Sequence, residues 1–162
     1  MKRLILSLVA LFCILPNINT LSAQEDGDFR FGFRTGYYFK TKAYGLGVYG
    51  NYGIADWLNI EPGVNVIFKE RSSVDVYCDL QVPLELGMDL YIFPIVGVSV
   101  NDITSHNGTV VGWAAGLNAG IGTKWYIDSR WSMNGQLKWM GRLPKKHECA
   151  LILAVGLDFT FL

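Results

Sequence analysis

The sequence has little of what most soluble enzymes and nucleic-acid-binding proteins carry. Only 17% of its 162 residues are charged, and 14 basic residues balance 14 acidic ones. That balance gives no excess of positive charge of the kind that binds nucleic acid. The two histidines, His106 and His147, lie in polar stretches far apart and indicate no metal site. No cofactor is therefore expected.

Long apolar runs and amphipathic helical patterns are also missing. No window reaches the 18 or so apolar residues of a membrane-spanning helix. The longest apolar run covers residues 4–15, follows Lys2 and Arg3, and is broken by Pro16. A basic start, a short apolar stretch and a small residue at Ala23 are typical of a secretory signal peptide. We therefore expect residues 1–23 to be a signal peptide and residues 24–162 to form one domain.

Glycine and aromatic residues are abundant, with 18 glycines and 22 Phe, Trp and Tyr residues. Beyond Asp28 the dominant pattern is alternation of apolar and polar residues, which is the signature of strands. Each of the segments is about ten residues or longer, the length with which a tilted strand crosses a bilayer. The eight predicted strands cover residues 29–39, 44–53, 58–68, 74–86, 90–100, 109–126, 131–140 and 149–161.

The connections between these segments alternate in character. "KTK", "KERSS", "NDITSHNG" and "GRLPKKHE" are polar, whereas "IAD", "GMD" and "IDSR" are tight. Such alternation is typical of an up-and-down barrel whose loops face one side and whose short turns face the other.

Each predicted strand has one apolar face and one face that mixes charge with glycine. Small residues suit the interior of an eight-stranded barrel, which is barely wide enough for side chains. Aromatic residues gather near both ends of the apolar face, as in the two interfacial belts of a membrane barrel. The sequence therefore predicts an all-β fold, an eight-stranded antiparallel up-and-down transmembrane β-barrel. A soluble barrel with the faces inverted is the alternative.

The alternation also predicts which charged side chains point into the barrel. Buried charges have to be paired, so we expect these residues to form a hydrogen-bonded plug; a narrow conduction or proton path is the alternative. The predicted lumen charges are Arg30, Arg34, Lys124 and Lys138, with Glu61, Asp75, Asp79, Glu85 and Asp158.

The remaining reactive residues favour no catalytic role. Ser105 adjoins His106, and the side chains of neighbours on an extended chain diverge, which is poor geometry for a nucleophile and its base. The two cysteines of the predicted barrel, Cys78 and Cys149, fall on strands four and eight, so we expect free thiols. "GRLPKKHE", with Arg142, Lys145 and Lys146, could contact lipopolysaccharide phosphates at an anionic surface.

Several stretches resemble the small outer-membrane β-barrel proteins of Gram-negative bacteria, the "porin family" that includes the transmembrane domain of outer membrane protein A. "FGFRTGYYF" resembles the first strand of this family, and "IADWLNIEPGVNVIFK" its tight turn and third strand. "VPLELGMDLYIFPIVGVSV" resembles the paired central strands, and "GWAAGLNAGIGTKWYIDSRWSM" the glycine-rich sixth strand and its turn. The resemblance covers residues 29–162.

The resemblance implies a location in the bacterial outer membrane, lipid and lipopolysaccharide as surroundings, and a monomer. It also implies that the barrel-assembly machinery reads the last strand through Phe159 and Phe161, although the chain ends one residue later, at Leu162. The function that we expect is structural or surface-interacting and non-enzymatic. The alternatives are a narrow transport or small-ligand module and, less favoured, a lipid-modifying enzyme.

Overall fold

A computed structural model describes residues 28–69, 72–87, 89–102, 112–143 and 149–161. The predicted signal peptide, residues 1–23, lies outside these ranges, as do Ser105, His106 and His147. Within the described ranges, no helix is long and apolar enough to cross a membrane.

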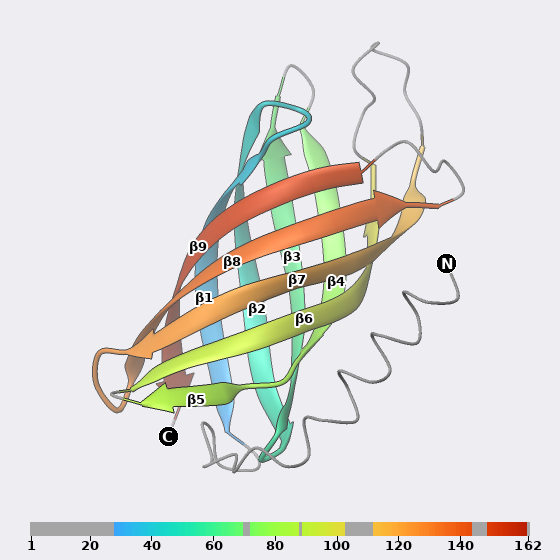
Figure 1. Cartoon of the computed structure of the whole chain (residues 1–162). Helices are drawn as coiled ribbons and strands as arrows, with labels where there is room; N and C mark the ends of the chain where they lie inside the picture. Colours follow the sequence, from blue (N-terminus) through green and yellow to red (C-terminus); the bar gives the residue numbers. More distant parts are fainter. Residues whose placement is uncertain (1–27, 70–71, 88, 103–111, 144–148, 162) are drawn as a thin grey trace, which may run out of the picture.

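The described residues fold into a barrel of long tilted strands (Figure 1). The period-two alternation of the sequence places one side chain toward the lumen and the next toward the outside. The strands are β1 (Phe29–Tyr38), β2 (Ala43–Ala55), β3 (Leu58–Phe68), β4 (Ser73–Gln81), β5 (Leu84–Gly87), β6 (Leu90–Asn101), β7 (Ala114–Tyr126), β8 (Trp131–Arg142) and β9 (Cys149–Phe161).

All neighbouring strands are antiparallel, and two pairings close the sheet into a barrel. β1 pairs with β9 from Phe29 opposite Phe161 to Tyr38 opposite Ile152. β4 pairs with β6 on the other side of the wall. The predicted eight-stranded antiparallel barrel is therefore confirmed, with β4 and β5 together forming its fourth strand.

The fourth predicted strand, residues 74–86, is interrupted at Val82 and Pro83. Proline has no backbone N–H to donate to the ladder. The register with β6 is nevertheless the same on both sides of the break, since Gln81 faces Ile95 and Leu84 faces Ile92. Prediction of one continuous strand here was wrong, although its path along β6 was right. β7 also begins later than predicted, at Ala114.

The outer surface of the wall is apolar. Large apolar side chains on this face are exposed by 38% at Val64 to 68% at Tyr44. Aromatic side chains lie near both ends of the barrel, with Phe39, Tyr44 and Phe68 at the end that carries the longer loops and Trp125 and Trp131 at the end with the tight turns. We call these the loop end and the turn end.

Glycines on the inner face make room for tyrosine rings on the neighbouring strand. Gly32 faces Tyr49 across β1 and β2, and Gly63 faces Tyr77 across β3 and β4. A Cβ at either glycine would overlap the ring opposite it. The glycine-rich inner face is therefore the counterpart of a row of large aromatic side chains that fill the lumen.

At the loop end the lumen is filled by apolar side chains. This apolar layer consists of Tyr38, Ala43, Ile67, Met140, Ala150 and Ile152, all of them buried and in mutual contact. The two central ion pairs of the interior, described below, lie between this layer and the turn end.

Candidate functional site

The interior of the barrel holds a connected set of charged and polar side chains. Eight of the nine charged residues that the alternation predicts for the lumen are buried there: Arg30, Arg34, Glu61, Asp75, Asp79, Lys124, Lys138 and Asp158. They come from six different strands, so that the barrel wall brings together groups far apart in the sequence. We call the buried set of these residues and their hydrogen-bond partners the lumen network.

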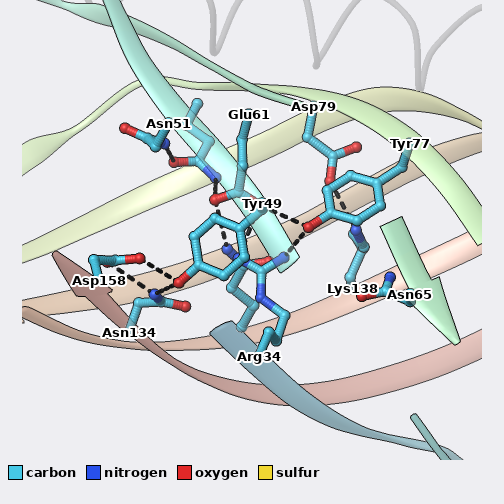
Figure 2. Close-up of polar contacts among 12 residues, drawn as sticks. Arg34, Tyr49, Asn51, Glu61, Asn65, Tyr77, Asp79, Asn134, Lys138 and Asp158 are labelled. Carbon is cyan, nitrogen blue, oxygen red and sulfur yellow. Dashed lines mark hydrogen bonds and ion pairs between the residues drawn. The ribbon is translucent and has the colours of Figure 1, made fainter. Parts of the chain in front are cut away.

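Arg34 on β1 is the centre of the lumen network (Figure 2). Its guanidinium lies 2.8 Å from the Glu61 carboxylate and donates to the Tyr77 hydroxyl at 2.7 Å. The same guanidinium stacks over the Tyr49 ring, 4.1 Å from its centroid. One cation thus meets an acid and two aromatic rings, which compensates the cost of removing it from water.

Amide side chains complete the surroundings of Glu61. Gln81 donates to the Glu61 carboxylate at 2.7 Å and accepts from Asn51 at 3.0 Å. Gln136, on the far strand β8, also reaches Glu61, at 3.5 Å. The carboxylate is therefore held from three sides of the barrel.

A second ion pair crosses the lumen between β8 and β4. The Lys138 Nζ lies 2.7 Å from Asp79, whose other oxygen accepts from Asn118 at 2.8 Å. The ammonium also lies 3.9 Å from the centre of the Tyr77 ring. Tyr77 thus contacts the cations of both ion pairs and links them.

Asp158 on β9 collects a third group of donors. It accepts from Tyr49, from Ser132 at 3.2 Å and from Asn134 at 3.0 Å, and Lys124 lies 3.8 Å away. Tyr49 connects this group to Arg34 through the stacking described above. Asp158 is wholly buried, so these donors replace the water that a carboxylate loses on burial.

The two other buried charges lie toward opposite ends of the barrel. Arg30, near the turn end, contacts the Tyr126 hydroxyl and stacks on its ring, and Asp28 lies 3.7 Å away. Asp75, toward the loop end, accepts from Asn65 at 3.2 Å.

Two predictions about charged residues are corrected. Glu85 lies on the short strand β5, which extends past the start of β3 at the turn end. Its side chain is exposed there and takes no part in the buried contacts described above. Arg142, predicted in an outer loop, is instead buried at the end of β8 and donates to the carbonyl oxygens of Asn101 and Gly112 at 3.4 Å. Lys145 and Lys146 lie outside the described residues.

A search of the sequence for charged residues finds only about half of the lumen network. Tyr49, Tyr77, Asn51, Gln81 and Gln136 all lie on the same inward face as the charged residues. The signal that identifies them is their position in the alternation, together with the glycine opposite each tyrosine. Every charge of the central network thus has polar or aromatic partners that a search for charged residues does not find.

The arrangement favours fixed charges rather than a reacting centre. The central acids are each held by a cation or by amide and hydroxyl donors. In the described part of the chain, no group of three or more His, Cys, Asp and Glu residues is placed to hold a metal ion.

Outside the barrel interior, backbone N–H groups of Arg130 and Trp131 lower the pKa of the Asp128 carboxyl in the β7–β8 turn.

The predicted assembly residues lie on the outer face at the turn end. Phe159 contacts both Trp131, at 5.0 Å between ring centres, and Phe161, at 5.3 Å. Phe161 in turn stacks on Phe29 at 6.1 Å. This aromatic row crosses β8, β9 and β1, and thus covers the seam where the last strand meets the first.

Comparison with known proteins gives a likeness of structure without a likeness of sequence. No protein-family model and no curated protein matches the chain. Among solved structures, the N-terminal β-barrel domain of Pseudomonas aeruginosa OprF aligns with a TM-score of 0.72 and 18% identity, covering 85% of this chain and 100% of that domain. Neisserial surface protein A gives 0.65 and 9%, covering 83% and 96%.

A third similar structure is Ail of Yersinia pestis, with a TM-score of 0.54 and 10% identity, covering 84% of this chain and 99% of that protein. At such identities the likeness establishes the barrel fold and leaves the function to be argued from the chain itself.

The Lys138–Asp79 pair gives a direct test of the lumen network. We expect Lys138→Met to lower the free energy of unfolding by about 3–5 kcal/mol, because it leaves the buried Asp79 carboxylate without its cation. Adding Asp79→Asn should recover most of that loss. Urea unfolding in lipid vesicles, followed by the migration of unboiled samples on gels, measures both variants.

Arg130→Met serves as the control, since Arg130 is exposed in the β7–β8 turn and its loss should change stability by no more than about 0.5 kcal/mol. A double variant as unstable as Lys138→Met alone would show that the two charges do not stabilise each other.

Proposed function

We propose that this protein is an integral β-barrel of the bacterial outer membrane, exported by its N-terminal signal peptide. The main evidence is that the apolar face of the sheet points outward and the charged face points inward, the opposite of a soluble barrel. Side chains such as Leu153 and Val98 are exposed on the outside by 49% and 56%, whereas Arg34, Asp79 and Lys138 are buried inside. An apolar exterior of this extent suits a lipid environment, and a closed sheet leaves no backbone edge unpaired there.

A soluble barrel would need the opposite arrangement, with its charges in water and its Val, Leu and Ile side chains in the core. The similar structures support the membrane alternative, because they include named outer-membrane and surface proteins.

The depth dependence of a charged substitution tests the membrane location. Val155 lies halfway along β9 on the outer face, and Ile127 lies in the β7–β8 turn. We expect Val155→Arg to lower folding stability in bilayers by about 2–4 kcal/mol and Ile127→Arg by about 0–1 kcal/mol. Folding into vesicles of graded urea content measures the difference. Equal effects of the two substitutions, or a variant that is soluble without detergent, would contradict a membrane location.

Within that membrane we propose a structural or surface-interacting role without enzymatic activity. Two features close the lumen: the central charges of the lumen network are paired across it, and the apolar layer fills its loop end. A wall of eight strands encloses only enough space for side chains. The lumen network therefore acts as a plug that also braces opposite walls.

A narrow transport or small-ligand role is the second candidate. The observation that favours it is the unbroken chain of polar contacts from Asp158 through Tyr49 and Arg34 to Tyr77 and Lys138. Opening such a path would require the apolar layer to separate.

Electrical recording in planar bilayers separates the two candidates. We expect the purified barrel to give no steady current steps, since both the paired charges and the apolar layer exclude hydrated ions. Uniform steps that disappear when Arg34 or Asp79 is replaced by alanine would overturn the plug and establish a conducting lumen.

We further propose that the two ends of the barrel face different surroundings. Among the described residues, the exposed charges of the loop end are the basic Lys40, Lys42 and Lys69. Those of the turn end are the acidic Asp56, Glu85, Asp89 and Asp128 together with Arg130. A basic rim at the loop end complements the phosphates of lipopolysaccharide on the outer surface.

The remaining partner that we propose is the barrel-assembly machinery. Phe159 and Phe161 end the last strand in the alternating aromatic pattern that outer-membrane barrels share, so they are the residues that such machinery would read before the seam closes. Once the barrel is closed, both rings contribute to the aromatic row across that seam. The folded barrel is expected to be a monomer.

A further inference from the structure

The outer face of the barrel carries a groove of about 690 Å³ that crosses β3, β2, β1, β9 and β8. Phe33, Phe68 and Met133 are large side chains along it, whereas Thr35, Val48 and Val155 are smaller ones. Because these strands pair in register, Val66, Leu46, Thr35 and Val155 form one row across the wall, and this row, which has no aromatic side chain, is the floor of a trough.

Thr35 is the position that creates this trough. The other outward residues of β1 are Phe29, Phe31, Phe33 and Tyr37, all aromatic. The Thr35 hydroxyl donates to the backbone oxygen of Gly45 at 3.3 Å, so its polar atom is engaged within the wall. What remains toward the outside is an apolar surface below the level of the neighbouring rings.

The loop end of the groove adjoins the basic rim. Phe68 lines the groove and is followed directly by Lys69, and Phe68 faces Tyr44, two residues after Lys42. An apolar trough on the lipid side and two exposed ammonium groups at its end complement one kind of molecule. That molecule has a negatively charged phosphate head and a long acyl chain.

We propose that this groove is a binding site for one acyl chain of lipopolysaccharide, whose phosphate is held by Lys42 and Lys69. The proposal rests on the outer-membrane location and goes beyond it, because it distinguishes one patch of the wall from the rest of the lipid-facing surface. The ammonium groups hold the head by charge, and Phe33 and Phe68 flank the chain.

Filling the groove tests the proposal. Thr35→Phe completes the aromatic row of β1 and occupies the trough, while Val98→Phe on β6 adds the same ring to the outer face away from the groove. The measured quantity is the lipopolysaccharide retained per barrel after extraction in mild detergent, determined by native mass spectrometry. We expect Thr35→Phe to lose most of it and Val98→Phe to retain the wild-type amount.

Replacing the lysines tests the head-group contact separately. Lys42→Gln and Lys69→Gln should each weaken retention by roughly fivefold. Retention unchanged in Thr35→Phe, or lost equally in Val98→Phe, would overturn the groove as a site while leaving the outer-membrane location intact. Absence of the protein from outer-membrane fractions would instead overturn the location itself.

A separate observation inside the barrel points to a bound water molecule. An enclosed cavity of about 10 Å³, large enough for about one water, is lined by Arg34, Gly36, Asn65, Gln136 and Lys138, among others. Gln136 and Arg34 are both more than nine-tenths buried. Among the described residues, neither the Gln136 Oε1 nor the Arg34 Nε has a hydrogen-bond partner.

We infer that one water molecule occupies this cavity, donating to Gln136 Oε1 and accepting from Arg34 Nε–H. A single ion fits the cavity less well than a neutral molecule, because its two cations, Arg34 and Lys138, are already paired with Glu61 and Asp79. The water links Gln136 to Arg34 and belongs to the plug rather than to a path through it.

Gly36→Ala distinguishes a hydrated cavity from a dry one by the sign of its effect. A Cβ at Gly36 would lie 3.4 Å from the Ala154 Cβ and 3.6 Å from Ile152, so it fits without strain. It would displace the water and leave two buried polar atoms unpaired, so we expect a lower urea midpoint. In a Gln136→Met background, where the acceptor is absent, the same change should lower the midpoint less, because only the Arg34 Nε–H then loses its partner.

The control is Gly135→Ala on the outer face, where a Cβ would have one neighbour, Thr123 Oγ1 at 3.6 Å. It measures the gain that alanine gives in a strand without a cavity. A midpoint raised by Gly36→Ala as much as by Gly135→Ala would overturn the inference, as would a high-resolution crystal structure without density between Gln136 and Arg34.

Discussion

The structure depends on one constraint: each strand must have a hydrogen-bonded neighbour on both sides. The pairings of β1 with β9 and of β4 with β6 meet that constraint by closing the sheet. Closure with eight strands fixes a narrow interior. The narrow interior then decides what the inward positions can hold, which is a single layer of interlocking side chains from opposite walls.

On the inner face of the wall, large tyrosine rings lie opposite glycines on the neighbouring strand. Tyr49 and Tyr77 lie across Gly32 and Gly63, and their rings carry the guanidinium of Arg34 and the ammonium of Lys138. The acids Glu61 and Asp79 then complete two ion pairs. A barrel with its apolar residues outside thus obtains its core from charge pairing and aromatic stacking, the reverse of a soluble domain.

Much of the barrel and of its buried charge set could be predicted from the alternation of the sequence. Once one residue of a strand is assigned to the inner or outer face, the faces of all its other residues follow. Arg34, Glu61 and Lys138 were placed inside by parity alone. The break at Pro83 was not predicted, since the residues before and after this proline keep the same alternation of inward and outward side chains. Glu85 was misplaced because parity gives the face of the wall and not the height along the barrel. Arg142 was misplaced because the predicted strand ends at residue 140, whereas β8 continues to Arg142. Which ions pair also depends on how far neighbouring strands are staggered around the barrel, and the alternation within one strand does not give that stagger.

The apolar layer at the loop end has a consequence for how the protein can change over time. Tyr38, Ile67, Met140 and Ile152 lie between the loop end and the two central ion pairs, Arg34 with Glu61 and Lys138 with Asp79. A loop can therefore accept insertions or exchanges without disturbing the ion pairs that brace the wall. The wall and the loops can thus diverge at different rates, because a change in one does not alter the contacts of the other.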